Sequence, residues 1–508
     1  MNKSYKAIVE KLFFLCRNIN DTLFKKEQAG EELTFLDHYV FQASSYIVSL
    51  IYNIVFFDRN SFCTSFLIRC LIECNALMKM YVAGEVPQEA TELINEYNYI
   101  AEYNVYKRYK DKLNGVQFDF DQIENNHELA KEKYRKHSNL SSSEFNKLIQ
   151  SKVPFLLDEF SFDELIKKYS ADYYQYYRLL SVILHPSDML LTYPVLQKED
   201  LTPLMKRLFA DFIDVLIGQY IDASFIGKKT LKQEIDFIFS SGLNHIYMQH
   251  ATKQKKILFN VAEIIEKAHS ENTMSYIFRE LGTSIEEMAL DKTFGFSEVV
   301  KCKFKPVIEI LAMSNYLLKL PHTIEKHHLE QLITKHTRIN LMAALDLDFS
   351  NENKDAFELM KKENKDVNKE EFLKNFKHSL GFSPKKISIN KLVRSLIDDF
   401  IPKNETFNSH MKMVYDEAQL LSHANGYMIS SNSGAFMEYS SVIPFVDYLI
   451  SALLDYYIAE WKLYDIYEGE GKHADFISSI KNCLNDFSKE AKLKNEMDKK
   501  WQKYKVTY

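Results

Sequence analysis

The fold class of this chain is decided by two apolar stretches, SFLIRCLIECNALM at residues 65–78 and KCKFKPVIEILAMS at residues 301–314. Each stretch is apolar around most of a helical circumference, which is typical of a helix buried on all sides. Each also carries one cation with a glutamate four positions later, a spacing that brings two side chains together on one helix face. These pairs are Arg69 with Glu73 and Lys305 with Glu309. The two stretches therefore predict two buried helices that each hold an ion pair.

Two further segments recur in the same order in both halves of the chain. The first pair is YYQYYRLLSVILHPS at 173–187 and MKMVYDEAQLLSHANG at 411–426, and the second is FIDVLI at 212–217 and FVDYLI at 445–450. Glu73 precedes His185 by 112 residues, and Glu309 precedes His423 by 114 residues. Similar segments in the same order and at nearly equal intervals predict a tandem duplication.

Composition agrees with a helical fold. The 508 residues include 13 Gly and 10 Pro, far fewer than the turns of sheets and sandwiches require. Hydrophobic residues make up 46% of the chain, which is enough for a sizeable core and argues against a disordered chain. We therefore expect an all-α fold of two related helical-bundle units packed with pseudo-two-fold symmetry.

The duplication divides the chain into two units and a tail. We expect the first unit at residues 1–228, the second at 232–468, and a charged helical tail at 469–508. In each unit a polar insert lies between the glutamate and the histidine, at 112–160 and at 346–390. Two capping boxes predict helix starts inside the units. They are Ser161 with Glu164 and Ser284 with Glu287.

Charge and cysteine content argue against several classes of protein. The chain has 64 Lys and Arg against 70 Asp and Glu, a balance that disfavours non-specific nucleic-acid binding but allows a local basic groove. Six cysteines without a C-x-x-C pair predict buried free thiols in a reducing cytoplasm. The N-terminus lacks the features of a signal peptide. The apolar run at 442–461 is interrupted by Asp447 and Asp455, so we expect no transmembrane helix and a cytoplasmic location.

A candidate catalytic pair lies at the end of the first histidine segment. Arg178 and His185 are seven residues apart, about 20° short of two helical turns, so they lie on one helical stripe about 10 Å apart. Tyr177 and Ser181 border this stripe. Pro186 disfavours helical conformation at the preceding residue, which places His185 at a helix C-terminus. The helix dipole favours the protonated form of a histidine at that end.

This pair suits one kind of chemistry. A histidine that gains and loses a proton near neutrality is a candidate general acid or base. An arginine on the same face could hold a phosphate or stabilise the charge of a phosphoryl transition state. Arg178 and His185 therefore suit metal-independent RNA cleavage, in which a ribose 2′-hydroxyl attacks its own phosphate.

The same residues resemble a known family. Arg-x6-His at the end of a helix, in an all-helical unit, resembles the R-x4-6-H signature of the HEPN superfamily. RCLIE at 69–73 together with YYRLLSVILHPS at 176–187 is similar to an uncharacterised bacterial HEPN-like group. The resemblance covers most of the first unit and, more faintly, most of the second.

The resemblance implies a metal-independent endoribonuclease that acts as a bacterial toxin or phage-defence effector. RNA and a regulatory or antitoxin protein are the partners it implies. HEPN proteins usually act as dimers, with two such motifs facing each other across a cleft. A tandem duplication would build that cleft inside one chain, although a homodimer of the whole chain stays open.

The second unit departs from the family pattern. Aligning His423 with His185 puts Asp416 where Arg178 stands. A paired site would then hold both histidines, with His423 opposing the first motif, and only one arginine. This asymmetry fits a single site, or a non-catalytic helical interaction or sensor protein that retains the scaffold.

Glu73 and Glu309 have two interpretations. Each is either half of a buried ion pair, which is weak evidence for stability, or a carboxylate that orients a functional residue. In the second interpretation, Glu73 orients Arg178 or His185, and Glu309 does the same for His423. A small-ligand pocket lined by Tyr173, Tyr177 and Glu73 is a further alternative.

No cofactor or metal site is predicted. PHTIEKHHLEQLITKH at 321–336 is rich in histidine, but only His328 and His336 share a helix face. They are two turns apart, which is too far for one metal ion. GEGK at 469–472 lacks the spacing of a phosphate-binding loop.

Overall fold

A computed structural model of the chain consists of packed α-helices, and the described residues contain no strand. The expected all-α class is therefore confirmed, while the pseudo-two-fold arrangement of two units stays a prediction. The described residues are 3–56, 62–86, 90–112, 120–138, 141, 161–183, 198–219, 231–240, 242–268, 273–293, 297–319, 335, 338–339, 342–343, 346–363, 368–370, 388–400, 404–421, 442–469 and 471–505.

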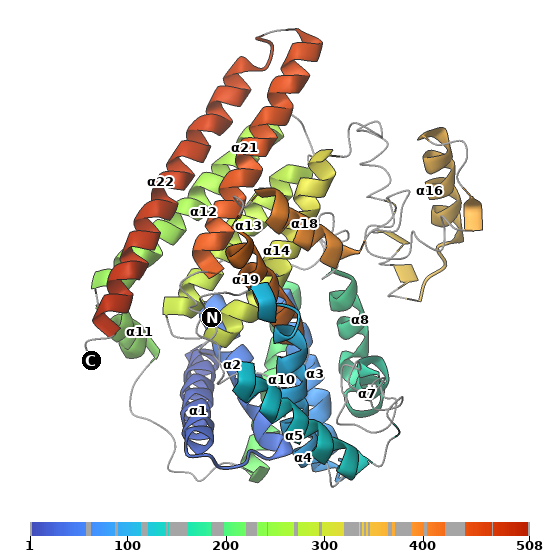
Figure 1. Ribbon diagram of the computed structural model, residues 1–508, viewed down its shortest axis with the longest axis vertical. Coiled ribbons are helices and arrows are strands. Elements are labelled where there is room, and N and C mark those ends of the chain that lie inside the picture. The colour runs from blue at the N-terminus through green and yellow to red at the C-terminus, as the bar shows by residue number, and fades with distance from the viewer. Residues whose placement is uncertain are drawn as a thin grey trace.

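The helices of the first unit form the lower half of the molecule in Figure 1. They are α1 (Lys3–Gln28), α2 (Phe35–Phe56), α3 (Phe62–Val82), α4 (Ala90–Tyr106), η1 (Lys110–Lys112), α5 (Phe120–Ser138), α7 (Phe162–Tyr169), η2 (Ala171–Tyr173), α8 (Tyr174–Ile183) and α10 (Lys198–Gln219). α3 packs against α2, α7, α8 and α10. α7 starts at the predicted capping box, because the Ser161 side chain accepts from the backbone of Glu164 and the Glu164 carboxylate accepts from the backbone of Ser161.

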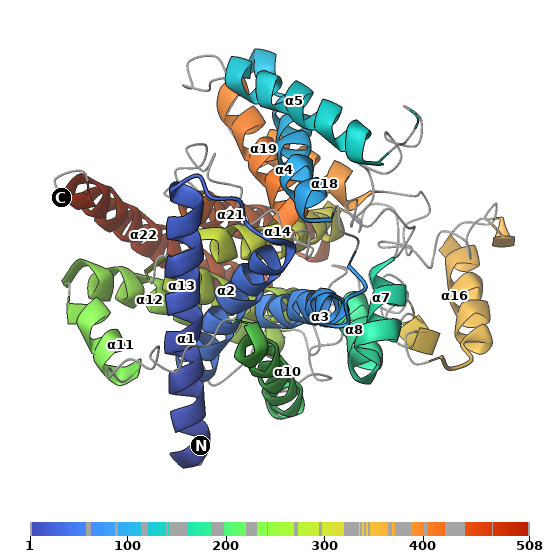
Figure 2. The same cartoon turned by 90° about the horizontal axis from the view of Figure 1, so that it is seen from below.

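Most of the later helices form the upper half of the molecule in Figure 1. They are α11 (Leu231–Ser240), α12 (Gly242–Ala268), α13 (Thr273–Thr293), α14 (Ser297–Lys319), α16 (Ser350–Glu363), α18 (Ile389–Phe400), α19 (Glu405–Leu421), α21 (Val442–Glu468) and α22 (Ala474–Lys505). α14 packs against α13, α18, α19 and α21, and α22 packs along α12 and α21. α16 stands apart from the bundle in Figures 1 and 2.

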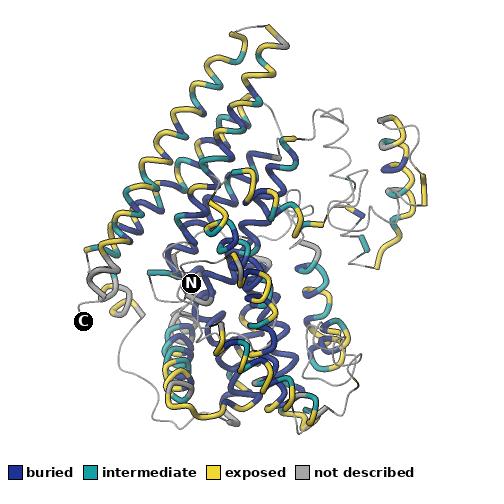
Figure 3. Tube along the Cα trace, viewed as in Figure 1, coloured by how far each residue is buried: buried dark blue, intermediate teal, exposed yellow. Residues whose placement is uncertain are grey.

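The two stretches that decide the fold class lie against each other in the middle of the molecule. They form α3 and α14, which are in contact, and the dark core in Figure 3 runs through both. Every residue from Phe62 to Met78 is buried. The Lys305 amino group lies 6.0 Å from the centre of the Phe66 ring. These helices can bury all faces because apolar residues surround them.

A buried ionic cluster joins α2 to α13 and α14. The Lys303 amino group lies 2.6 Å from Asp291 Oδ2 and 3.3 Å from Glu287 Oε2, and all three side chains are inaccessible to solvent. Ser49 donates to Asp291 Oδ1 at 2.8 Å, and Asn53 donates to Glu287 Oε2 at 3.3 Å. Burial alone would lower the pKa of Lys303, but the two carboxylates reverse the sign and hold it above its usual value. The contact between the two halves is therefore polar and charged as well as apolar.

The second predicted capping box is wrong. Ser284 and Glu287 lie inside α13, which starts at Thr273, and both are buried. Their side chains instead contact buried groups of the core. The Ser284 hydroxyl lies 3.6 Å from Cys63 Sγ, and Glu287 belongs to the ionic cluster. The serine–glutamate spacing is the same as at Ser161, so only the packing of the helix separates the two cases.

The six cysteines are buried and free, as predicted. One helix in the described part of the chain, Val442–Ile466, is long and apolar enough to cross a membrane, and 61% of its most apolar window is buried. Within it Asp447 pairs with Lys494 of α22 at 2.9 Å, and both side chains are nearly inaccessible. A core helix of a folded domain passes the same test, so the expected absence of a transmembrane helix stays a prediction.

Candidate functional site

A buried ion pair within α3 is bonded to a tyrosine of α8. Arg69 Nη2 donates to Glu73 Oε1 at 2.8 Å, and the Tyr177 hydroxyl of α8 donates to the same oxygen at 3.3 Å. The Arg69 guanidinium carbon also lies 5.9 Å from the centre of the Tyr177 ring. Glu73 therefore connects α3 to α8 through Tyr177, the residue that directly precedes Arg178.

The charge states of this cluster follow from its burial. Burial raises the pKa of Tyr177, and the negative charge of Glu73 raises it further. Burial alone would lower the pKa of Arg69, but Glu73 holds it above its usual value. Tyr177 therefore stays a hydrogen-bond donor and Arg69 stays a cation.

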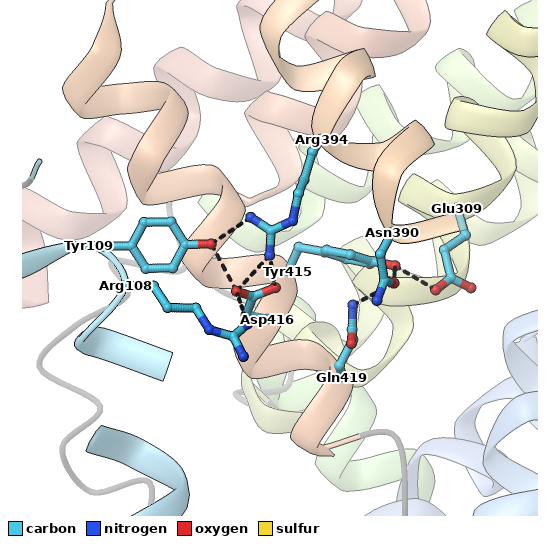
Figure 4. A network of polar contacts seen from close by, with 8 residues as sticks. All are labelled: Arg108, Tyr109, Glu309, Asn390, Arg394, Tyr415, Asp416 and Gln419. Atoms are coloured by element: carbon cyan, nitrogen blue, oxygen red, sulfur yellow. Dashed lines mark hydrogen bonds and ion pairs between the residues drawn. The ribbon is translucent and has the colours of Figure 1, made fainter. Parts of the chain in front are cut away.

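Residues of the predicted second unit form a similar arrangement. Lys305 lies 3.3 Å from Glu309, and the Tyr415 hydroxyl of α19 donates to Glu309 Oε1 at 2.8 Å. Asn390 Oδ1 lies 2.9 Å from the same hydroxyl and accepts from Gln419 at 2.9 Å. Figure 4 shows this chain of contacts from Gln419 to Glu309. A tyrosine of α8 is thus bonded to the glutamate of α3, and a tyrosine of α19 to the glutamate of α14.

Removing either tyrosine hydroxyl is expected to destabilise the protein. Tyr177→Phe and Tyr415→Phe each withdraw one donor from a buried carboxylate, which costs about 1–3 kcal/mol. Urea unfolding monitored by circular dichroism measures the change. Tyr176→Phe is the matched control, because Tyr176 lies on α8 and is exposed, and it should leave the midpoint unchanged. Equal midpoints for Tyr177→Phe and Tyr176→Phe would contradict the expectation.

Arg178 contacts the second unit rather than Glu73. Its Nη1 lies 2.6 Å from Asp346 Oδ2, and its Nη2 donates to the backbone oxygen of Ala343 at 2.6 Å. The guanidinium carbon lies 5.7 Å from the centre of the Tyr174 ring. The Arg178 side chain is 22% exposed and that of Asp346 is 66% exposed. Of the two residues that Glu73 was predicted to orient, Arg178 is contacted by Asp346 and Ala343 while Glu73 contacts its neighbour Tyr177, and His185 lies outside the described residues.

Asp416 occupies the equivalent position in the second unit and is held by three residues. Arg394 Nη2 lies 2.6 Å from one carboxylate oxygen and 2.8 Å from the other. The Tyr109 hydroxyl donates at 2.8 Å and Arg108 Nη1 at 3.2 Å to that second oxygen. Figure 4 shows the three side chains converging on Asp416, whose side chain is only 6% exposed. A buried carboxylate with this many donors is a structural group.

The remaining predicted residues are placed as follows. His185 and His423 lie outside the residues that the structure describes. Ser181 lies on α8 and is partly buried. The Tyr173 hydroxyl donates to Asp211 at 2.9 Å, so Tyr173 and Tyr177 serve different carboxylates and do not converge with Glu73 on one pocket.

Sequence reasoning missed the partners of Arg178 and Asp416. One signal was present, because Asp346 lies 238 positions after Arg108, the same interval that separates Asp416 from Arg178. Within the described ranges, no group of three or more His, Cys, Asp or Glu residues is placed to hold a metal ion.

Comparison of the chain with protein-family models, curated proteins and solved structures finds no match. The fold and the site define a helical protein in which two central helices each carry a cation–glutamate pair that is bonded to a tyrosine of a neighbouring helix.

Proposed function

We propose that the chain is a tandem duplication of one HEPN-like unit and that it cleaves RNA, without a metal, at a single site in the first unit. The order and lengths of the helices support the duplication. α1, α2 and α3 have 26, 22 and 21 residues, and α12, α13 and α14 have 27, 21 and 23.

Reciprocal contacts support a two-fold relation between the units. Glu287 lies 238 positions after Ser49, and Asp291 lies 238 positions after Asn53. Ser49 donates to Asp291, and Asn53 donates to Glu287. A two-fold axis turns every contact between positions i and j into a contact between j and i, which is the pattern of these two bonds. Tyr415 follows Tyr177, and His423 follows His185, by the same 238 positions.

The observation that carries the catalytic proposal is the place of Arg178, at the boundary between the two units and partly exposed. The resemblance to HEPN proteins puts the active site at such a boundary. Arg178 would hold the scissile phosphate, and His185 would move the proton of the 2′-hydroxyl or of the leaving oxygen. Tyr177, fixed by Glu73 and Arg69, would position α8, the helix that carries Arg178. Asp416 cannot replace an arginine, so one site is proposed.

The test is RNA cleavage by purified full-length protein in EDTA, with wild type beside His185→Ala. Loss of a general acid or base typically costs about 10²–10⁴-fold in rate, so we expect a loss of that size in the variant. His245→Ala, a change at an exposed histidine of α12, is the matched control and should cleave like wild type. Cleavage that needs a divalent metal, or that survives His185→Ala, would contradict the proposal.

A second candidate function is favoured by one specific contact. Both terminal nitrogens of Arg178 are engaged inside the protein, by Asp346 and by the Ala343 carbonyl. This engagement favours a non-catalytic interaction or sensor protein that retains the scaffold. Absence of cleavage by wild type across several structured and unstructured RNAs would select this second function.

A further inference from the structure

Two ion pairs between the units lie at equivalent positions of the repeat. At each of these positions the first unit has an arginine and the second unit has an aspartate. Arg178 of the first unit pairs with Asp346 of the second at 2.6 Å, and Arg108 of the first unit pairs with Asp416 of the second at 3.2 Å. Asp346 follows Arg108 by 238 positions, and Asp416 follows Arg178 by 238 positions. The two-fold operation that exchanges Ser49–Asp291 with Asn53–Glu287 therefore also exchanges these two ion pairs.

The charges are not distributed symmetrically between the units. The first unit supplies the arginine at both equivalent positions, and the second unit supplies the aspartate at both. Two first units packed in the same way would place Arg178 against Arg108. Two second units would place Asp346 against Asp416. Like charges brought together across an interface cost free energy, and such repulsion is a common source of pairing specificity.

In the buried part of the same interface, pairing between two second units would also bring like charges together. Ser49 and Asn53 are neutral, whereas the equivalent Glu287 and Asp291 are acidic and share Lys303 as a counter-ion. Two second units would face Glu287 of one with Asp291 of the other, in a region closed to solvent. The native pairing instead gives each buried carboxylate a neutral donor from the first unit.

We propose that Arg108, Arg178, Asp346 and Asp416 select pairing between unlike units, so that a first unit packs on a second unit and not on another first unit. The inference rests on the duplication proposed above and not on RNA cleavage. Asp346 is the first residue of the second insert and contacts α8, whereas Arg108 lies between α4 and η1, just before the first insert, and contacts α19.

The Arg178–Asp346 pair is the better place for a test. Asp416 also has Arg394 and Tyr109 as partners, so a new charge opposite it meets a partly neutralised carboxylate. Among the residues described around Arg178, Asp346 is the carboxylate that contacts it, and Tyr174 and the Ala343 carbonyl are its other neighbours.

The experiment is a charge-reversal cycle in the full chain, with Arg178→Ala, Arg178→Asp, Asp346→Arg and the exchanged pair Arg178→Asp/Asp346→Arg. Urea midpoints at low salt measure stability, and hydrogen exchange in α2 and α13 measures the pairing of the units. We expect Arg178→Asp and Asp346→Arg each to lower the midpoint and to speed exchange in α2 and α13. Arg178→Asp should exceed Arg178→Ala in both readouts, and the exchanged pair should recover most of the loss caused by either single reversal, short of the part that the Ala343 and Tyr174 contacts of Arg178 contribute. The differences should shrink in 1 M salt, where exposed charges are screened.

The matched control is the ion pair of Arg207 with Asp172, which is exposed and lies within the first unit at 2.7 Å. Reversing Arg207 should leave exchange in α2 and α13 unchanged. The proposal is overturned if Arg178→Asp behaves like Arg178→Ala, or if the exchanged pair stays as weak as the single reversals. It is also overturned if the Arg207 control moves the exchange rates as far as Arg178→Asp does. None of these readouts uses RNA, so a chain that does not cleave RNA would leave this result standing.

Discussion

Replacing Lys303 with methionine is expected to lower the free energy of unfolding by about 3–5 kcal/mol, the usual cost of removing one partner from a buried ionic group. Lys303 lies within 3.3 Å of two carboxylates, and none of the three side chains reaches solvent. Without the ammonium group, Asp291 and Glu287 keep the neutral donors Ser49, Asn53 and Thr64 but lose their shared counter-ion. Burial already raises the pKa of Asp291 in the native protein, so loss of the lysine would favour its protonated form further. Urea unfolding at neutral pH measures the loss.

Two variants separate the charge from the packing. Lys303→Met/Glu287→Gln/Asp291→Asn removes all three charges and should recover much of the stability, because replacing a whole buried ionic group is often neutral. Lys319→Met, on the same helix, breaks the exposed pair with Asp399 and should cost only a small fraction of the Lys303 effect. The carboxylates hold the pKa of Lys303 above its usual value, so its contribution to stability is fully present below the ordinary lysine pKa of about 10.5 and is lost as the pH rises from there through the raised pKa of the folded protein. A Lys303→Met protein as stable as Lys319→Met would contradict this account.

The second large effect is expected at Arg178, on activity rather than on stability. If the proposed ribonuclease site is correct, Arg178→Ala should slow RNA cleavage by at least about 100-fold, the usual cost of one group that stabilises transition-state charge. The same change should leave the urea midpoint nearly unchanged, because an ion pair at an exposed carboxylate contributes little to folding. Single-turnover cleavage assays in EDTA, at equal concentrations of folded protein, give the rate.

Asp416→Ala is the matched control at the equivalent position of the other unit. It leaves Arg394 and the Tyr109 hydroxyl without the carboxylate that they share, so stability should fall while cleavage per folded molecule stays within a few-fold of wild type. Arg178→Ala is therefore expected to lose activity but keep its stability, and Asp416→Ala to lose stability but keep its activity. A cleavage loss in Asp416→Ala as large as that in Arg178→Ala would contradict a single site in the first unit.

Much of the helical architecture could be predicted before any tertiary contact was known. The Arg69–Glu73 and Lys305–Glu309 pairs follow from the i, i+4 geometry of a helix, which depends only on neighbouring residues. The burial of α3 follows equally from apolar residues on all of its faces. The repeated segments also put Tyr177 and Tyr415 at equivalent positions, and both proved to be bonded to the repeated glutamates.

The candidate site could be predicted only in part. Arg178 was identified from its spacing to His185, but its partners Asp346 and Ala343 lie more than 160 residues away in the chain. The alignment on the histidines indicated only that Asp416 stands where the first unit has Arg178. In the structure Asp416 is a buried acceptor for Arg394, Tyr109 and Arg108. A substitution that removes one charge pattern can create another, and the new partner is visible only when distant segments are packed together.

Helix type, the repeat and the pairs within one helix turn were thus determined by local order along the chain, because helical hydrogen bonds and i, i+4 contacts join near neighbours. Packing alone decided that Ser161 and Glu164 cap a helix while Ser284 and Glu287 do not. It also decided that Lys303 is neutralised by Asp291 and Glu287, that Arg178 pairs with Asp346, and that Asp416 pairs with Arg108. The physical reason is that desolvation and long-range pairing depend on which surfaces meet, and no short stretch of sequence contains both surfaces.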